Sequence, residues 1–285
     1  MTVTHILFPF DFSAQGEEAA PFVRALANTF GAKTTLLSVI PPAFDAMPAG
    51  VASRTSGDPA QWVGTLQSHL DNALTEKLAG LRVDRVVDTG DPAFTITRFA
   101  RNHDVDLIMM PTHGLGLFRT MLLGSVTSKV LHDATCPVWT AAHAETQTAT
   151  DLPKTVLCAV DGTPETPALV QWAAEFSAKM GARLNLLHVV GPITDWPSLA
   201  RERRLQDAIR EEAHATISSM VKSAGVDLPL RVAVGEIVPT VTEEASQAGA
   251  DLVIVGRGSV AEPFGRLRTH AFGIIQRSLC PVLSV

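Results

Sequence analysis

Residues 5–13 read His-Ile-Leu-Phe-Pro-Phe-Asp-Phe-Ser, and residues 155–163 read Thr-Val-Leu-Cys-Ala-Val-Asp-Gly-Thr. Each stretch is a short apolar run that ends in an aspartate, with a small hydroxyl residue two positions after it. The two aspartates, Asp11 and Asp161, are 150 positions apart (161 − 11). A strand-like run that recurs at this distance indicates that the chain contains the same domain twice.

Four further pairs of matching segments follow in the same order along the chain. They are residues 36–41 with 186–191, 86–90 with 232–235, 106–110 with 251–255, and 136–138 with 280–282. The spacing falls slowly to 144 positions (280 − 136), as expected for a duplication followed by small insertions and deletions. A polar stretch, residues 143–153, separates the copies. We therefore predict one domain over residues 1–145 and a second over residues 152–285.

Length and composition agree with two soluble domains. The chain has 285 residues, about twice the ~100–150 residues of a common domain, and 46% of them are hydrophobic. A net charge of −6 argues against nonspecific binding to nucleic acid or to an anionic membrane. Three widely spaced cysteines predict neither a disulfide framework nor a zinc site. Because the first residues lack a secretion signal and no apolar run is long enough to span a bilayer, we expect a cytoplasmic protein.

Apolar runs alternate with segments of helix length in each copy. In the first copy we predict strands at 4–10, 33–39, 82–88, 106–110 and 137–141, and helices at 13–30, 60–80, 93–102 and 124–134. The strands are nearly continuous apolar runs, which is typical of strands covered on both faces. The predicted fold class is α/β, with two tandem Rossmann-like domains, each a five-stranded parallel sheet with helices on both faces.

Several candidate binding residues stand where predicted strands end. Asp11, Val39, Met110 and Pro111 lie at or just after the carboxyl ends of three different strands. Parallel strands bring these ends to one rim of the sheet, and ligands bind at that rim where the strand order reverses. We therefore expect the binding site there.

A glycine-containing segment follows the fourth predicted strand. Residues 111–126 read Pro-Thr-His-Gly-Leu-Gly-Leu-Phe-Arg-Thr-Met-Leu-Leu-Gly-Ser-Val. Gly114 and Gly116 allow a ligand to approach the backbone closely. Ser125 lies at a predicted helix start, where free N–H groups and the helix dipole attract phosphate. The chain has no Gly-x-x-x-x-Gly-Lys-[Ser/Thr] motif, so this anion site is not a P-loop.

The Leu-Leu-Gly-Ser-Val of residues 122–126, followed by a helix and by Cys-Pro-Val at 136–138, resembles the universal stress protein family. The resemblance covers essentially the whole chain, twice, and implies a fold like that of adenine nucleotide alpha-hydrolases. The ATP-binding signature of the family is Gly-x-x-Gly, nine residues, then Gly-Ser or Gly-Thr. Gly114 and Gly124 have this nine-residue gap, and Ser125 follows.

The resemblance implies that the first copy binds ATP, with Mg²⁺ accompanying the nucleotide. The residues that we assign to this site are Pro9, Phe10, Asp11, Val39, Met110, Pro111, Gly114, Gly124, Ser125 and Val126. The resemblance places Asp11 and Val39 against the adenosine. Met110 and Pro111 border the ribose and phosphates, and the last four residues hold the triphosphate.

Both copies depart from the signature. Pro111 stands in place of its first glycine, and proline has no N–H to donate to a ligand. In the second copy Gly256 retains the first glycine, but Ser259 replaces the second, and Arg268-Thr269 stand where the first copy has Gly-Ser. Asp161 is retained, although an aspartate at a strand end is also a common helix cap. We predict that the second copy does not bind ATP.

Three classes of function remain, and the sequence favours the first. It is a stress-response regulator whose ATP occupancy is read by unidentified protein partners; the second is a nucleotide-independent tandem scaffold. The third is an enzyme of similar architecture, but His113 has no nucleophile or carboxylate placed near it by sequence, so we predict no enzyme. Residues 44–60 form either a lid or a merely disordered excursion. The two copies are expected to pack as an internal pseudo-dimer, and further homodimerisation stays open.

Overall fold

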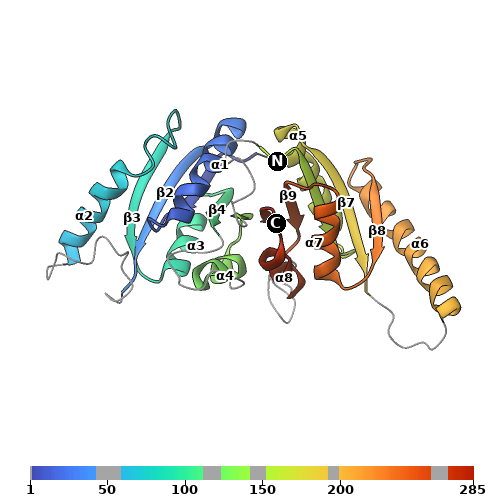
Figure 1. Cartoon of the computed structure of the whole chain (residues 1–285). Helices are drawn as coiled ribbons and strands as arrows, with labels where there is room; N and C mark the ends of the chain where they lie inside the picture. Colours follow the sequence, from blue (N-terminus) through green and yellow to red (C-terminus); the bar gives the residue numbers. More distant parts are fainter. Residues whose placement is uncertain (1, 43–58, 112–122, 142–151, 192–198, 258–268) are drawn as a thin grey trace. The chain divides into compact units, whose positions relative to one another are not determined.

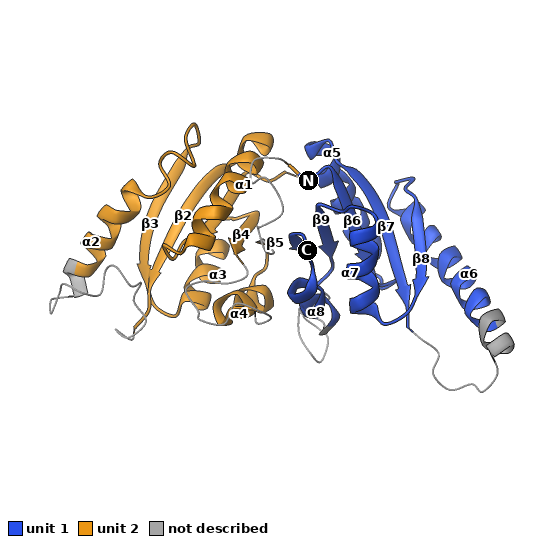
Figure 2. Cartoon of the chain, in the orientation of Figure 1, with its two compact units in different colours: residues 1, 153–285 blue, residues 2–152 orange. Residues whose placement is uncertain are grey.

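The structure is a computed structural model that describes residues 2–42, 59–111, 123–141, 152–191, 199–257 and 269–285. The chain divides into two compact units, an N-terminal unit of residues 2–152 and a C-terminal unit of residues 153–285 (Figure 2). Most of the predicted linker, residues 143–153, lies outside the described residues. Each unit has its own parallel sheet and its own helices.

The N-terminal unit alternates strands and helices (Figure 1). Its elements are β1 (His5–Pro9), α1 (Ala14–Phe30), β2 (Lys33–Ile40), α2 (Pro59–Asn72), β3 (Val83–Thr89), α3 (Pro92–Asn102), β4 (Leu107–Pro111), α4 (Ser125–Asp133) and β5 (Val138–Ala141). The strands are parallel and lie in the order β3-β2-β1-β4-β5. The chain thus moves outward from β1 to β3 and returns to place β4 on the other side of β1.

The C-terminal unit repeats this arrangement. Its elements are β6 (Thr155–Val160), α5 (Thr166–Met180), β7 (Arg183–Val190), α6 (Leu199–Ser223), β8 (Leu230–Val234), α7 (Ile237–Gln247), β9 (Leu252–Val255), α8 (Thr269–Arg277) and β10 (Val282–Ser284). The strands lie in the order β8-β7-β6-β9-β10 and are again parallel. The predicted α/β class, with five parallel strands in each of two tandem Rossmann-like domains, is confirmed.

The central strands form the core of each unit. Every residue of β9 is buried, and in β1 and β4 only the terminal proline is partly exposed. Right-handed crossovers place the two helices before the reversal on one face of the sheet and the two after it on the other. The last two helices of each unit accordingly pack together, α3 with α4 and α7 with α8.

Local sequence signals set the helix ends. The Ser13 Oγ accepts a hydrogen bond from the Gly16 N–H at 3.1 Å and caps the start of α1. Gly31, with φ of 69°, ends the same helix in a left-handed conformation. Asp91 caps α3 through the Phe94 N–H, and Pro92 occupies its first turn, where no N–H is required.

One predicted helix is shorter than the sequence pattern suggested. The helix predicted over residues 60–80 ends at Asn72, and residues 73–80 form turns. The Thr75 hydroxyl donates to the Asn72 carbonyl at 2.9 Å, and Leu74 has φ of 55°. A side-chain hydroxyl that bonds the backbone in this way competes with helix continuation.

A carboxylate at the amino edge of each sheet joins the first and fourth strands of its unit. The Asp106 Oδ2 accepts from the Thr4 N–H (2.7 Å), the Thr4 hydroxyl (2.8 Å) and the His5 N–H (3.0 Å). In the C-terminal unit the Asp251 Oδ2 accepts from the Lys154 and Thr155 N–H groups at 2.9 and 3.0 Å. This aspartate clamp satisfies backbone donors that precede the sheet ladder.

Candidate functional site

The strand ends of the N-terminal unit bring most of the predicted site residues to one rim. Pro9 is the last residue of β1 and pairs with Leu37 of β2. Phe10 and Asp11 follow directly. Val39 is the second-last residue of β2. Because β1 pairs with β2 on one side and with β4 on the other, Asp11 emerges between those two strands, at the point where the strand order reverses.

The start of α4 lies beside the end of β4. Met110 and Pro111 end β4, and the Thr127 hydroxyl of α4 donates to the Pro111 carbonyl at 3.3 Å. Gly124 is the N-cap of α4 and makes no side-chain capping bond, and Ser125 and Val126 form the first turn. Their N–H groups have no partner within the helix. This uncapped helix start therefore presents backbone donors next to the β4 end.

Three sequence predictions fall outside the described residues. Gly114, the neighbouring His113 and most of the predicted lid, residues 44–60, are among them. The last two residues of that segment, 59 and 60, belong to α2.

Asp11 is held lightly. Its Oδ1 accepts the Ser13 N–H at 3.1 Å, and this is the only hydrogen bond that the carboxylate makes to the described part of the chain. The residue is partly exposed. The carboxylate is therefore fixed at the rim with most of its acceptor capacity available.

The residue after Asp11 has an unusual backbone conformation. Phe12 has φ of 61°, a left-handed value that costs a non-glycine residue about 1–2 kcal/mol. Its ring packs on Phe10, with centroids 4.9 Å apart, and Phe10 packs on Phe8 at 6.2 Å. A Cβ at Gly16 would lie 2.9 Å from the Phe10 ring, so this glycine leaves room for it. Sequence reasoning missed both Phe12 and Gly16.

Pro111 departs from the glycine signature within a regular strand. It pairs with Ala141 at the end of the β4–β5 ladder, and it contributes its carbonyl to the contact with Thr127. Lacking an N–H, it offers a ligand no backbone donor at this place.

The rim of the C-terminal unit is more crowded. The Asp161 Oδ1 accepts from the Thr163 N–H (3.2 Å), the Thr163 hydroxyl (2.7 Å) and the Thr166 hydroxyl (3.4 Å). Gly162 follows with φ of 77°, and a Cβ there would lie 3.0 Å from the Ile217 Cδ1 of α6. The turn that corresponds to Asp11–Phe12 thus has a glycine in the left-handed conformation here. Its aspartate accepts several hydrogen bonds, and a side chain of α6 packs against it.

Two further side chains distinguish this second rim. The His188 Nδ1 of β7 lies 2.8 Å from the Val160 carbonyl and donates to it. Arg257 is buried, with 5% of its surface exposed, directly after Gly256, where the first copy has Thr112. Ser259 and Arg268 lie outside the described residues, and Thr269 is the first residue of α8.

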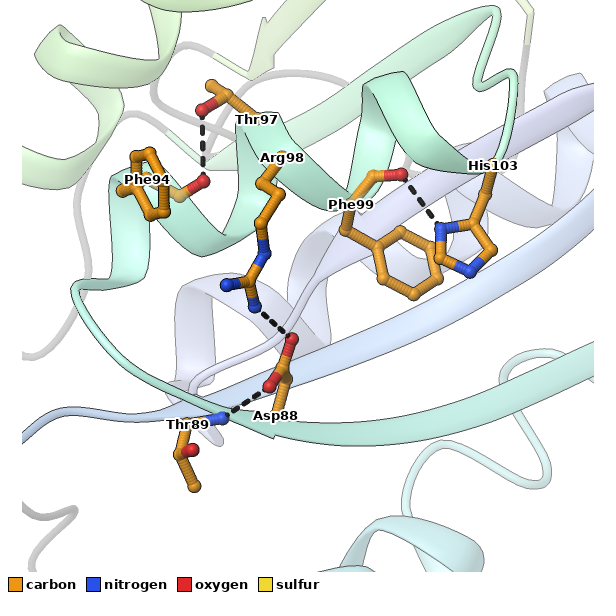
Figure 3. Close-up of polar contacts among 7 residues, drawn as sticks. All are labelled: Asp88, Thr89, Phe94, Thr97, Arg98, Phe99 and His103. Atoms are coloured by element: carbon orange, nitrogen blue, oxygen red, sulfur yellow. Dashed lines mark hydrogen bonds and ion pairs between the residues drawn. The ribbon is translucent and has the colours of Figure 1, made fainter.

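A polar network joins the end of β3 to α3 (Figure 3). The Arg98 guanidinium donates to the Asp88 Oδ2 at 2.8 Å, and the Thr89 N–H donates to the Asp88 Oδ1 at 2.7 Å. The Arg98 guanidinium lies over the Phe94 ring, 5.6 Å from its centre, and the Phe94 side chain is 56% exposed. At the helix cap, the Phe94 N–H and the nearby Lys129 lower the pKa of Asp91. Sequence reasoning did not single out this network.

Two of the three cysteines are buried. Cys158 lies inside β6, and burial raises the pKa of its thiol to about 12. Burial also raises the pKa of Cys280, which precedes β10. A buried thiol of this kind is inert near neutral pH. Across the described ranges, no group of three or more His, Cys, Asp or Glu residues is placed to hold a metal ion.

None of the helices in the described ranges is long and apolar enough to span a bilayer.

Two copies of one parallel α/β topology, each with its strand ends and helix starts gathered at the reversal point, define a tandem Rossmann-like protein. Comparison with known families gives the particular assignment. The profile of the Universal stress protein family matches residues 2–141 and again residues 153–285. The chain therefore belongs to the universal stress protein family, as the sequence motifs predicted.

Individual relatives agree with this assignment. A universal stress protein of Mycolicibacterium smegmatis is 26% identical over 261 residues, covering 88% of this chain and 86% of the relative. The crystal structure of a universal stress protein from Archaeoglobus fulgidus shares the fold with a TM-score of 0.67 at 22% identity, covering 99% of this chain and 96% of that one. A further universal stress protein, solved in complex with cAMP, is 27% identical over 47% of this chain and 96% of its own, with a TM-score of 0.34.

Proposed function

We propose that the N-terminal unit binds ATP at the carboxyl rim of its sheet and that the C-terminal unit does not. The observation that carries this proposal is the lightly bonded Asp11 at the reversal point, on the same rim as the uncapped start of α4. The Asp11 carboxylate accepts hydrogen bonds, and the N–H groups at the start of α4 donate them. A nucleotide has matching groups, with hydrogen-bond donors on its adenosine and acceptors on its phosphates.

The residues present fit such a ligand. The Asp11 carboxylate accepts only, so it pairs with a donor of adenosine, either the exocyclic amine or a ribose hydroxyl. Val39, near the end of β2, adds partly exposed apolar surface on the same rim, whereas Met110 is buried. The N–H groups at the start of α4 suit the phosphates, since a helix start attracts anions without a lysine.

Mg²⁺ would accompany the nucleotide in this proposal. In the described ranges no cluster of ligating side chains is available to it. The phosphates and water are therefore its expected ligands, which is how Mg²⁺ is commonly held in nucleotide sites. The ion would neutralise phosphate charge that Lys129, already 3.4 Å from Asp91, only partly offsets.

The contrast with the second rim supports the other half of the proposal. Three donors already occupy the Asp161 Oδ1, and Ile217 packs against the turn that follows. A nucleotide would have to displace these contacts. The C-terminal unit then serves as the partner of the ATP-binding unit within an internal pseudo-dimer.

The cellular role that we infer is regulatory. ATP occupancy of the N-terminal unit would be read by protein partners in a cytoplasmic stress response, and turnover of ATP is not part of the proposed role. One observation favours a second candidate, a tandem scaffold that binds partners without nucleotide. Pro111 removes a backbone donor from the rim, which weakens any phosphate contact made there.

Released nucleotide tests the proposal directly. The protein is purified gently and denatured, and the nucleotide is quantified by chromatography. We expect roughly one ATP per chain, lost in Gly124→Asp, which places a negative charge at the α4 start, and in Asp11→Ala. The matched variant Asp161→Ala should keep its ATP.

The opposite result has an equally clear meaning. If the protein carries no nucleotide and binds none when millimolar ATP and Mg²⁺ are added, the ATP proposal is wrong and the scaffold role replaces it. Because one relative was solved in complex with cAMP, cAMP is included as a competitor. Complete displacement of ATP by micromolar cAMP would show that the site prefers the cyclic nucleotide to ATP.

A further inference from the structure

The two units hold the same aspartate by different means. In the C-terminal unit, hydroxyl groups of Thr163 and Thr166 donate to Asp161. In the N-terminal unit, the Ser13 hydroxyl accepts from Gly16 instead, and only the Ser13 N–H reaches Asp11. Something other than hydroxyl donors must therefore hold the turn at Asp11.

Three positions around the turn differ together between the copies. The N-terminal unit has Phe10, Phe12 and Gly16, and the C-terminal unit has Val160, Gly162 and Thr166, each 150 positions later. Steric contact links the differences at positions 10 and 16. A threonine at position 16 would collide with the Phe10 ring, which a Cβ there already approaches to 2.9 Å.

The ring of Phe12 accounts for the conformation of the turn. A left-handed phenylalanine is unfavourable unless the surrounding structure compensates for it. Its contact with Phe10, 4.9 Å between ring centres, continues through Phe8, a fully buried residue of β1. The aromatic column of Phe8, Phe10 and Phe12 thus anchors the turn to the core of the sheet.

We propose that Phe12 is a positioning residue whose ring, packed on Phe10, fixes Asp11 at the rim while leaving its carboxylate free to accept from a ligand. In the C-terminal unit the glycine turn is fixed by hydrogen bonds that use the carboxylate itself. The ligand would be a hydrogen-bond donor of adenosine, and this part rests on the proposed ATP binding. The positioning itself does not depend on it.

Amide hydrogen exchange tests the positioning without nucleotide. The Ser13 N–H donates to Asp11, so its exchange rate reports whether the turn is held. Phe12→Gly keeps the left-handed conformation accessible and removes only the ring, so the variant should fold. We expect its Ser13 amide to exchange at least tenfold faster, while Phe12→Tyr stays near wild type. The Thr163 amide of the C-terminal unit, measured in the same samples, is the internal control.

Unchanged Ser13 exchange in Phe12→Gly would overturn the proposal. Faster exchange at both Ser13 and Thr163 would also overturn it, because it would show general loosening of the protein instead of a local effect of the ring.

Nucleotide discrimination tests the free acceptor. ATP is compared with ITP, which lacks the exocyclic amine, and with 2′-deoxy-ATP and 3′-deoxy-ATP, which each lack one ribose hydroxyl. Asp11→Ala, which should no longer retain ATP through purification, is titrated with added nucleotide at concentrations high enough to offset its weaker binding. It identifies the donor, because it removes the discrimination against one of these analogues. Phe12→Gly should reduce that same discrimination at least threefold, and Phe12→Tyr should restore it.

A purely structural role predicts a different pattern. If Phe12→Gly weakens ATP and all three analogues by the same factor, the ring only supports packing and the proposal fails. If wild-type protein binds none of the four nucleotides, the ATP proposal fails, and Ser13 exchange alone decides whether Phe12 positions Asp11.

Discussion

The amino and carboxyl edges of the two sheets have diverged to different degrees. At the amino edge the aspartate clamp is retained in both units, with Asp106 and Asp251 each accepting from two successive backbone N–H groups at the start of the first strand. At the carboxyl rim Asp11 makes one hydrogen bond within the described residues, whereas Asp161 accepts three through one oxygen. The duplicated chain has kept the contacts that close the amino edge of each sheet and changed those at the carboxyl rim.

The largest expected loss of stability comes from replacing the left-handed glycine of the C-terminal unit with the phenylalanine of the N-terminal unit. Gly162→Phe places a side chain where a Cβ already lies 3.0 Å from Ile217, at φ of 77°. Strain of about 1–2 kcal/mol and overpacking of about 1–3 kcal/mol together predict a loss of about 2–5 kcal/mol from the free energy of unfolding. Urea unfolding followed by tryptophan fluorescence measures it, since Trp172 lies in the same unit and contributes to the signal.

Gly181→Phe is the matched control for this substitution. Gly181 has φ of 70° but no atom within 4 Å of an added Cβ, so only the backbone strain applies. Equal losses for the two variants would show that the Ile217 contact does not close the second rim.

The aspartate clamp gives the next largest effect. Asp106→Ala leaves three donors without their carboxylate, the Thr4 N–H, the Thr4 hydroxyl and the His5 N–H. Hydrogen bonds to a charged group contribute about 1.5–3 kcal/mol each when buried, and these are partly exposed, so we expect a loss of about 2–4 kcal/mol for Asp106→Ala. Chemical denaturation of Asp106→Ala measures this loss, and a variant as stable as the wild-type protein would show that the clamp does not stabilise the sheet.

Acidic pH should lower the stability of the N-terminal unit more than that of the C-terminal unit. His5 is buried, and burial lowers its pKa; the His103 carbonyl bound to its Nδ1 and the Asp106 charge raise the pKa, while the Lys33 charge lowers it. The unfolded chain therefore binds the proton more readily, and stability falls as the pH drops below about 6.5 towards the lower folded pKa. Thr155 occupies this position in the C-terminal unit.

The urea midpoint of the N-terminal unit measures this effect between pH 7.5 and pH 5.5. We expect it to fall more in wild-type protein than in His5→Thr, which copies the C-terminal unit. A decrease of the same size in both proteins would remove His5 as its cause.

The smallest effect is expected for the ion pair in Figure 3. The Arg98 and Asp88 side chains are 41% and 34% exposed, and such a pair contributes under about 1 kcal/mol. Glu243 and Ala233 stand at these two positions in the C-terminal unit. Arg98→Ala should change the melting temperature by only a few degrees, less so in high salt, and a larger salt-independent loss would point to the contact with Phe94 instead.

Much of the fold could be predicted because the duplication provides a matching segment in the second copy for each predicted strand of the first. The five matched segments showed that the same strands follow one another along the chain in both copies, and the continuous apolar runs predicted a sheet covered on both faces. The order of the strands within each sheet came from the structure. The end of α2 at Asn72 escaped prediction because the Thr75 hydroxyl bond that competes with the helix depends on local geometry. Asp106 and Asp251 were matched in the sequence, but their role as clamps needs residues about 100 positions away.

The candidate site was predictable only in part. Strand ends such as Asp11 and Pro111 follow from the alternating pattern, because parallel strands carry them to one rim. The left-handed Phe12 does not follow from any propensity, since phenylalanine rarely adopts it. The one signal available was its alignment with Gly162, a residue that adopts positive φ readily.

The aspartate clamp also has a consequence for synthesis of the chain. Thr4 and Asp106 are 102 residues apart, so β1 stays an open sheet edge for roughly 5–20 s while the ribosome adds that length at about 5–20 residues per second. Until β4 is made, the edge of β1 that will pair with it is open, and an open strand edge is prone to aggregation. Nascent chains stalled before residue 106 should be protease-sensitive, and those stalled far enough beyond residue 152 for the whole N-terminal unit to have left the exit tunnel should be resistant. The N-terminal unit would then be complete before most of its twin has been translated.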